Sequence, residues 1–407
     1  MTVRANKPAF NIREKLKELT QSIGLKGREL MRAATAQEAR DLVSAGRRNL
    51  IINGKFEISQ RGTTFTYSGT AQDHTVYNSD RFTTQTFGSS FPSGNYLQIT
   101  QDTDVPTSEF KNSQKIEVLQ DISWGSGPNG VWTRQTIEGN NISHLGFGGS
   151  NPSTITLSFW VKATKSGTFT ATIKDSTSSV YYMCPVTIAS ANTWQYVTKT
   201  IPGATTGTWN TDNTEGLQVF LTWGIHSGWI AGTTTNQWAS GNISGTTTQT
   251  NFLTTDGDIV WITGVQLEVG KNATEFEHRS YGEELALCMR YYQKYTFNSA
   301  SYQRISAVTI PGTSTSTNAY GFLTLKERLR AAPTTSDITF SDANTFRMNG
   351  GGASDQTAST ISSSTNGIGI DVISFDVTFG TARTSGRSGW ISAEATPQAV
   401  IEVDVEL

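Results

Sequence analysis

Most of the chain alternates apolar and polar positions with a period of two. In residues 154–161 (TITLSFWV), Ile155 and Leu157 alternate with Thr156 and Ser158. Such alternation is typical of a half-buried β-strand. Similar short runs separated by Gly, Ser, Asn, Asp and Pro occupy residues 167–173, 181–188, 194–201, 217–223 and 258–267. The pattern predicts a jelly-roll β-sandwich over residues 49–280.

A helical pattern interrupts the predicted strands once. In residues 281–295 (YGEELALCMRYYQKY), Leu285, Cys288 and Tyr292 fall at helical spacing. This spacing predicts a short linker helix over residues 281–296. Strand alternation then returns at residues 370–379 and 399–407, whereas the Gly/Ser/Thr-rich residues 349–367 predict an exposed loop. We therefore expect a mainly β protein with a second, smaller β-sandwich over residues 297–407.

The first 48 residues have a different character. Ile12, Leu16, Leu19 and Ile23 line one face of a short helix, and residues 35–46 predict a second helix with a capping box at its start. This segment holds 11 Lys/Arg against 5 Asp/Glu, which leaves 21 basic and 29 acidic residues for the rest. Its charge fits either a solvated helix surface or docking onto an acidic partner.

Composition excludes several classes of protein. The chain has 407 residues, a net charge of −2 and only 16% charged residues, so no overall positive field would hold a nucleic acid. Its two cysteines, Cys184 and Cys288, can form neither a disulfide framework nor a four-ligand zinc site. No apolar run approaches the ~18 residues of a membrane helix, and the first residues lack the apolar core of a signal peptide.

No catalytic motif is evident. The four histidines (His74, His144, His226 and His278) contain no pair spaced as in a zinc protease. Gly386-Arg-Ser388-Gly389 lacks the last glycine and the strand-to-helix context of a nucleophile elbow. Residues 264–271 resemble a phosphate loop but have one residue too many, and Asn272 replaces the Ser/Thr that would hold magnesium. We expect no enzyme activity and no cofactor.

Two carboxylate clusters leave alternatives open. Asp256 and Asp258 flank Gly257, and Asp212 and Glu215 lie near asparagines. Such clusters are first of all typical of Asx-rich turns. They could also hold a structural calcium ion, since they offer several hard oxygens. A glycan-cleaving carboxylate pair would have the same composition.

Tryptophans offer the best candidates for ligand contact. Five of them lie in or beside Gly/Ser/Thr/Asn-rich segments: Trp124, Trp132, Trp223, Trp229 and Trp238. An exposed indole provides a flat apolar partner for a sugar ring, and neighbouring polar groups can bond its hydroxyls. The alternative is that they fill the core or a subunit seam. Trp229, Trp238 and, in the distal region, Tyr302 are the candidate glycan contacts.

Several motifs together resemble tail-fibre proteins of tailed bacteriophages. Residues 49–62 (NLIINGKFEISQRG) and 77–82 (YNSDRF) are similar to the N-L-hydrophobic-x-N-G-x-F-x-x-x-Q-R-G and Y-x-x-D-R-W elements that open these proteins, with Phe82 in place of Trp. The resemblance continues, in the same order along the chain, at residues 157–163, 194–203, 206–209, 263–277, 284–292 and 329–334, and residues 35–46 resemble helices near fibre N-termini.

The resemblance implies a virion tail protein that is made in the host bacterial cytoplasm. It implies a homotrimer whose central jelly roll is similar to carbohydrate-binding modules. Residues 1–48 would attach to tail or adaptor proteins, and the distal β domains would recognise a host-surface glycan or outer-membrane receptor. Within the motifs, Asn53-Gly54 suits a tight turn and Asp80-Arg81 forms an opposite-charge couple. Alternatives are a head fibre or tail adaptor, and a glycan-degrading tailspike.

Overall fold

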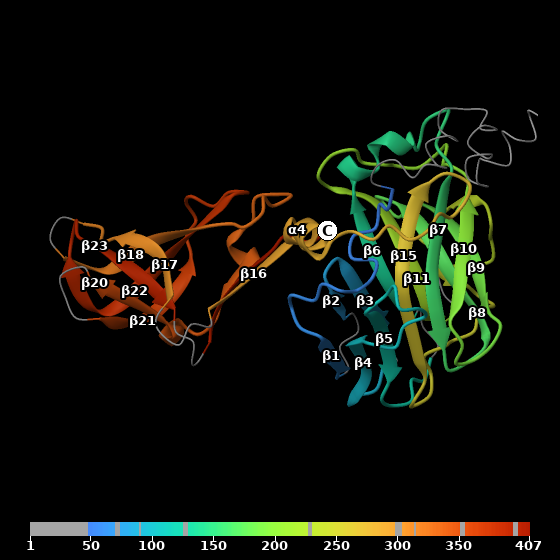
Figure 1. Ribbon diagram of the computed structural model, residues 1–407, viewed down its shortest axis with the longest axis horizontal. Helices are drawn as coiled ribbons and strands as arrows, with labels where there is room; N and C mark the ends of the chain where they lie inside the picture. The colour runs from blue at the N-terminus through green and yellow to red at the C-terminus, as the bar shows by residue number, and fades with distance from the viewer. Residues whose placement is uncertain are drawn as a thin grey trace, which may run out of the picture.

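The computed structural model describes residues 48–69, 74–88, 91–124, 129–226, 230–297, 303–312, 315–350, 355–393 and 398–407. The N-terminal helices expected within residues 1–48 lie almost entirely outside this set. Two β regions stand at opposite ends of the long axis, and helix α4 (Tyr281–Met289) lies between them (Figure 1). The mainly β fold class is confirmed. Among the described residues, no helix has both the length and the apolar character to cross a membrane.

The larger β region is a sandwich of two antiparallel sheets. One sheet has six strands in the order β1-β4-β5-β15-β7-β10, and the other has seven in the order β13-β9-β8-β11-β6-β3-β2. The strands of the first sheet are β1 (Thr64–Ser68), β4 (Asn95–Asp102), β5 (Ser113–Val118), β15 (Ile259–Val269), β7 (Ile155–Ala163) and β10 (Gln195–Ile201). Those of the second are β13 (Trp238–Ser240), β9 (Val180–Ile188), β8 (Gly167–Asp175), β11 (Glu215–Ile225), β6 (Gly130–Glu138), β3 (Phe82–Phe87) and β2 (Thr75–Ser79). A short parallel pair, β12 (Ala231–Gly232) and β14 (Gly245–Thr246), and two 3-10 turns, Gly139–Asn141 and Ser143–Leu145, complete the region.

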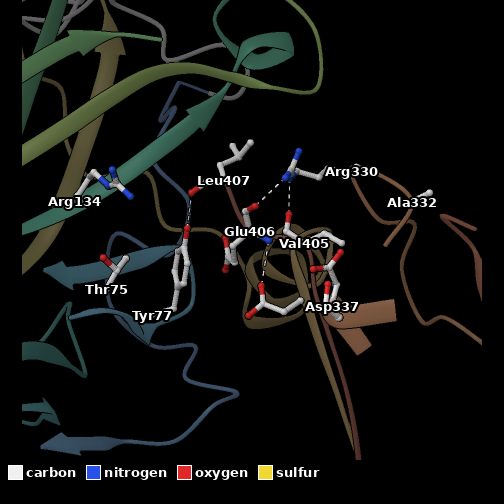
Figure 2. A pocket seen from close by; sticks show the side chains of 12 residues that line it. Thr75, Tyr77, Arg134, Arg330, Ala332, Asp337, Val405, Glu406 and Leu407 are labelled. Atoms are coloured by element: carbon white, nitrogen blue, oxygen red, sulfur yellow. Dashed lines mark hydrogen bonds between the residues drawn. The ribbon is translucent and has the colours of Figure 1, made fainter. Parts of the chain in front are cut away.

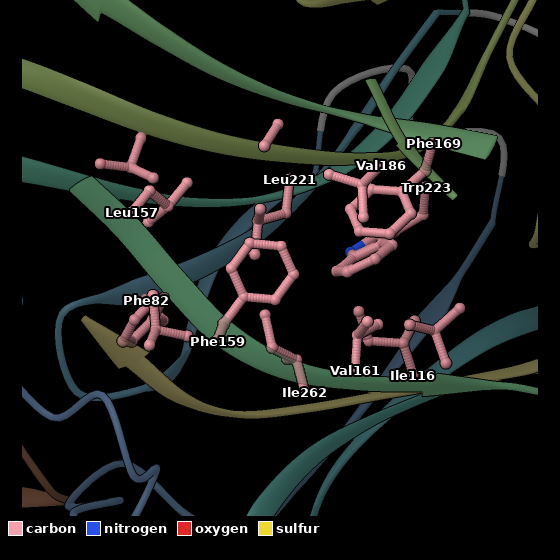
Figure 3. Packing of buried hydrophobic residues seen from close by; sticks show 14 of the residues in the cluster. Phe82, Ile116, Leu157, Phe159, Val161, Phe169, Val186, Leu221, Trp223 and Ile262 are labelled. Atoms are coloured by element: carbon pink, nitrogen blue, oxygen red, sulfur yellow. The ribbon is translucent and has the colours of Figure 1, made fainter. Parts of the chain in front are cut away.

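Aromatic and branched side chains fill the space between the two sheets. Phe159 and Phe169, from opposite sheets, pack with Trp223 (Figure 3), and the ring centroids of Phe169 and Trp223 lie 4.9 Å apart. The Trp223 indole N–H donates to Thr133 Oγ1 at 2.9 Å, so burial leaves its polar atom satisfied. Each such buried side chain stabilises the fold by about 1.5–3 kcal/mol relative to exposure.

The two cysteines are free thiols. Cys184 packs in the sandwich core, whereas Cys288 lies on α4 in a separate cluster with Ile52, Ile58 and Tyr291. Burial raises the pKa of the Cys184 thiol to about 12. Both thiols are therefore shielded from each other and from thiol reagents.

The smaller β region differs from the expected second sandwich. It combines a three-stranded sheet in the order β16-β24-β19 with a closed six-stranded barrel in the order β17-β18-β22-β21-β20-β23. The strands of the sheet are β16 (Tyr292–Phe297), β24 (Ala399–Asp404) and β19 (Ile338–Phe340). The strands of the barrel are β17 (Gln303–Thr309), β18 (Thr315–Thr324), β22 (Val372–Thr384), β21 (Gln356–Ser363), β20 (Phe346–Gly350) and β23 (Ser388–Ala393). Two 3-10 turns lie at Thr335–Asp337 and Ala343–Thr345. Closure removes the exposed edges that two small open sheets would leave.

Two sequence expectations in this region are wrong in extent. The loop expected over residues 349–367 contains β21, whose Ala358 is buried in the barrel. The linker helix expected over residues 281–296 ends at Met289, because the following Tyr-rich segment pairs with β24 instead. The helix starts with a capping box of Ser280 and Glu283, a Ser-x-x-Glu signal that is visible in the sequence.

Candidate functional site

A hollow of about 400 Å³ lies on the outer face of the six-stranded sheet. Its floor is formed by Trp160 on β7 and Tyr196 on β10, which are direct cross-strand neighbours with ring centroids 5.1 Å apart. The strand period places these rings outward, because the adjacent Phe159, Val161 and Val197 point into the core. The Tyr196 side chain is 43% exposed, an unusual state for a large aromatic group. We call this hollow the groove.

A bulge in β15 gives the groove its shape. The pairing of β15 with β7 shifts register between Thr263 and Gln266, and Gly264 in this bulge has a φ of +64°. A Cβ atom at Gly264 would lie 2.9 Å from the Phe110 ring and 3.2 Å from the Trp160 ring. Only glycine therefore allows these two rings to approach the bulge.

One wall of the groove is formed by residues 273–278. Two buried side chains of β15 hold it in place: the Glu268 carboxylate accepts from the Thr274 N–H at 2.8 Å and hydroxyl at 2.7 Å, and Gln266 Oε1 accepts from the Glu277 N–H at 2.9 Å. Gln266 and Glu268 belong to the motif of residues 263–277 that carries much of the tail-fibre resemblance. Gln266 and Glu268 therefore position the wall, while the following residues of the same motif, Thr274 and Glu275, line the groove.

The opposite wall is the β4–β5 connection, which carries Glu109 and Phe110. Asp104 in this connection pairs with Lys162 on β7 and accepts from the Trp194 indole N–H at 2.9 Å. Although burial alone would raise the pKa of Asp104, these hydrogen bonds hold it below its usual range. The Lys162 ammonium also lies 4.1 Å from the centre of the Trp261 ring. The connection is thus fastened beside the floor.

Side chains of both walls meet across the groove. The ring centroids of Phe110 and Phe276 lie 5.4 Å apart, and those of Phe110 and His278 lie 5.7 Å apart. Hydroxyl, carboxylate and imidazole groups line the same space as the aromatic floor: Ser158, Thr274, Glu109, Glu275 and His278. Flat aromatic surface surrounded by a few polar groups is the composition that suits a sugar ring.

Among the predicted glycan contacts, only Trp238 is a described residue, and it does not line the groove. Trp229 and Tyr302 fall outside the described residues. Trp238 is partly buried, its indole N–H donates to the Pro202 carbonyl at 2.7 Å, and its ring packs edge-on against Trp209 at 5.7 Å. Glycan contact by these three residues stays a prediction.

The other singled-out tryptophans are packing residues. Trp132 and Trp223 are buried, and Trp124 packs edge-on against Phe91 with centroids 6.3 Å apart. The sequence did contain a signal for the groove. Trp160 occupies the polar half of an alternating strand, where a large aromatic residue has no core to fill.

The carboxylate clusters form turns. Asp258 accepts from the backbone N–H groups of Thr254 and Thr255 and pairs with Lys165. Asp212 accepts from the Thr214 N–H at 2.9 Å, as in an Asx turn. Within the described part of the chain, no group of three or more His, Cys, Asp or Glu side chains is placed to bind a metal ion.

The remaining resemblance motifs converge between the two β regions. The Asp80-Arg81 couple is not an ion pair: Asp80 accepts from the Gln60 N–H at 2.9 Å, whereas Arg81 pairs with Glu406. Arg81 has a φ of +70°, is 1% exposed and lies 3.5 Å from the centre of the Tyr291 ring. Arg81 therefore braces the residues that follow the last strand, at Glu406, and those that follow α4, at Tyr291.

Further contacts make the junction a continuous polar seam. Arg290 forms a two-pronged ion pair with Glu138 at 2.6 and 2.9 Å, and the Tyr291 hydroxyl donates to the same carboxylate at 2.8 Å. Although burial alone would raise the pKa of Glu138, these partners hold it below its usual range. The Asn53 side chain links Ile58 to the Asp80 carbonyl.

A cavity of about 490 Å³ lies in this seam (Figure 2). Its polar lining is largely engaged within the chain. Arg330 donates to the carbonyls of Val405, Glu406 and Asn213, and the Tyr77 hydroxyl donates to the Leu407 carbonyl at 2.7 Å. These bonds fasten the two β regions to each other, so we regard the cavity as part of the junction and the groove as the candidate binding site.

Comparison with known proteins gives weak likenesses. No family model and no curated protein matches the sequence. Among solved structures, the enzymatically active domain of tailspike protein 4 of bacteriophage CBA120 aligns with 55% of this chain at 13% identity and a TM-score of 0.27, and this alignment spans only 21% of the tailspike chain. TmCBM61, solved with β-1,4-galactotriose, aligns with 55% of this chain and all of its own at 10% identity and a TM-score of 0.28. The CBM22-1 xylan-binding domain of Paenibacillus barcinonensis Xyn10C aligns with 56% of this chain and all of its own at 10% identity and a TM-score of 0.24. Values this low do not establish a shared function.

Proposed function

We propose that this chain is a non-enzymatic, glycan-binding structural protein of a bacteriophage tail that takes part in host attachment. The observation that carries glycan binding is the groove, whose aromatic floor of Trp160 and Tyr196 lies open between two walls that are fastened by hydrogen bonds. A site that is preformed in this way binds without first ordering its side chains. The groove adds a surface of the sandwich to the candidate contacts suggested by the sequence, which are Trp229 and Trp238 in the sandwich region and Tyr302 in the distal region.

The virion role rests on the sequence motifs. The motifs that resemble tail fibres build the groove wall and the junction between the two β regions. This structural role is consistent with a protein that holds a binding surface in a fixed position on a virion. The proposed homotrimer and the attachment of residues 1–48 to tail or adaptor proteins follow from the same resemblance. Immuno-electron microscopy of the phage particle tests the location: label at the head, or none on the virion, would contradict a tail protein.

Glycan binding is tested with the full chain on an array of bacterial surface polysaccharides, followed by calorimetry on the best ligand. Tyr196→Ala should weaken binding at least tenfold, because it removes half of the stacking floor while leaving the core intact. Tyr281→Ala is the matched control, since Tyr281 is 60% exposed and lies on α4, away from the groove. Equal affinity of Tyr196→Ala and the unchanged chain would refute the groove as the site.

Two alternatives give different results in the same assays. A chain that binds no host polysaccharide but binds another virion protein would be a head fibre or tail adaptor. A polysaccharide that becomes shorter during incubation with the chain would identify a glycan-degrading tailspike.

A further inference from the structure

The barrel carries aromatic side chains on its outside as well as on its inside. Tyr320 and Phe322 on β18 are 52% and 56% exposed, and Trp390 on β23 is 42% exposed. These are three of the five most exposed large apolar residues of the described chain. The core does not require them, because Ala319, Gly321 and Ile391, which alternate with them, face the interior.

The three exposed residues form one continuous stripe. Strand β17 separates β18 from β23, and its outward residues on this face are small: Thr309 pairs with Tyr320, and Ala307 pairs with Trp390. Small residues between larger ones let the three rings share one surface. We call Tyr320, Phe322, Trp390 and these two β17 residues the barrel stripe.

Opposite charges stand at the two ends of the barrel stripe. Asp376 on β22 is the direct cross-strand neighbour of Tyr320, beyond the β18 side. Arg304 lies at the other end, with its guanidinium carbon 4.9 Å from the centre of the Trp390 ring. Asp376 is half-buried, and its buried Oδ1 accepts no hydrogen bond from the described residues. The stripe thus runs from a negative end to a positive end.

We infer that the barrel stripe is a surface through which one copy of this chain binds a second copy. A stripe with opposite charges at its ends is complementary to itself, since a second copy turned by half a rotation places its Arg304 against Asp376 of the first. Tyr, Trp, Phe and Arg are also the residue types that concentrate binding energy at protein interfaces. This inference depends neither on glycan binding in the groove nor on the proposed homotrimer, because a two-fold contact joins copies that belong to two different trimers.

The size of the stripe predicts the strength of the contact. An enclosed aromatic side chain buries about 150–250 Å², so three half-exposed rings supply on the order of 300 Å² per copy. A stable interface needs roughly 800 Å² per partner. We therefore take the stripe as the apolar centre of a larger contact, whose rim is made by the surrounding Ser and Thr side chains. Because the apolar centre is small, the association is weak and depends on protein concentration.

Sedimentation equilibrium of the full chain over a wide concentration range tests the inference. Tyr320→Ser combined with Phe322→Ser should weaken self-association at least tenfold, the loss of one strong interface contact. The far-UV spectrum and unfolding midpoint should stay unchanged, because both side chains lie outside the barrel. Tyr281→Ser is the matched control and should associate like the unchanged chain.

A charge exchange tests the orientation. Arg304→Glu alone and Asp376→Lys alone should each weaken self-association, whereas an equimolar mixture of the two variants should regain it, because each then offers the partner's complement. Self-association that the aromatic variant leaves unchanged would overturn the inference, as would a chain that stays monomeric at all concentrations. A barrel-stripe variant that loses glycan binding but associates normally would identify the stripe as a ligand site instead.

Discussion

The two outer faces of the sandwich are built from similar strands, but one face is accessible to solvent and the other is covered by a segment of the chain. On the face of the six-stranded sheet, which we call the grooved face, Trp160 and Tyr196 remain accessible between two walls. On the face of the seven-stranded sheet, which we call the covered face, residues 230–250 lie across β8 and β11. The difference supports our proposal that the sandwich uses one face for stability and leaves the other for binding.

Threonines make the covered face possible. The hydroxyls of Thr172 and Thr222 both donate to the Ser244 carbonyl, at 3.0 and 2.6 Å, and Thr170 donates to Gln249 Oε1 at 2.8 Å. All three threonines are completely buried. Their β-branched carbons pack on the pleated sheet while their hydroxyls satisfy the backbone of the covering segment.

The sharpest test replaces one tryptophan on each face. Trp132→Ala on the covered face should lower the free energy of unfolding by about 3–5 kcal/mol, because Trp132 is 5% exposed and packs with Phe220, Ile225 and Ile230. Trp160→Ala on the grooved face should cost about 1 kcal/mol or less, because its ring is partly exposed, yet weaken glycan binding at least tenfold. Urea denaturation and calorimetry measure the two effects.

The two substitutions serve as controls for each other. If Trp160→Ala destabilised the chain more than Trp132→Ala, the grooved face would be a packing surface, and its assignment as a binding face would fail. If Trp132→Ala weakened glycan binding while the chain stayed folded, the two faces would not be independent.

The covered face should also impose a pH dependence on stability. Lys174 on β8 is 2% exposed, and burial, together with the nearby charge of Arg134, lowers its pKa to about 7, although Asp175 and Glu215 oppose the shift. An unfolded lysine titrates near pH 10.4, so between these values the unfolded chain binds more protons than the folded chain. The free energy of unfolding should therefore rise with pH from about 7 to 10, by roughly 2–4 kcal/mol, and stay level with respect to this group below pH 7.

Lys174→Met isolates this effect. The variant should show a flatter stability curve between pH 7 and 10, measured by urea denaturation at closely spaced pH values. It also loses the hydrogen bonds from Lys174 Nζ to Asn242 and Ser244, both 2.8 Å, so its absolute stability is less informative than its slope. An equally steep rise in the variant would assign the pH dependence to other groups.

The strands could be predicted from the sequence, whereas the covered face could not. Alternation located β7 to β11 and β15 because the period of two is a local property. The same alternation suggests that the threonines of β8 and β11 face water, and it cannot reveal that residues far along the chain bond their hydroxyls. The closed barrel was missed for a related reason, since two small sheets and one closed sheet have the same strand pattern.

The candidate site was only partly predictable. Trp160 stands out in the sequence as an aromatic residue at a polar position, but the walls of the groove come from segments about 50 residues before it and about 115 residues after it. The contacts of the junction are still less local, because Arg81 pairs with Glu406, which is 325 residues later and just beyond the last strand. A neighbouring opposite charge, such as Asp80, is the more obvious partner in a sequence, yet the left-handed backbone of Arg81 directs it elsewhere.

The smallest expected effect distinguishes the shape of the grooved face from its composition. Gly264→Ala adds a methyl group against the Phe110 and Trp160 rings and places alanine at a φ of +64°. The left-handed backbone should cost about 1–2 kcal/mol in unfolding free energy. The displaced rings should, in addition, weaken glycan binding measured by calorimetry.

Gly257→Ala separates these two consequences. Gly257 has a φ of +83°, but an added Cβ there would have no described neighbour within 4 Å. This variant should therefore show the same loss of stability as Gly264→Ala while its glycan affinity stays unchanged. Equal affinity in both variants would mean that the close approach of Phe110 and Trp160 at the bulge does not shape the binding surface. The contrast between the two faces would then depend only on the solvent exposure of Trp160 and Tyr196.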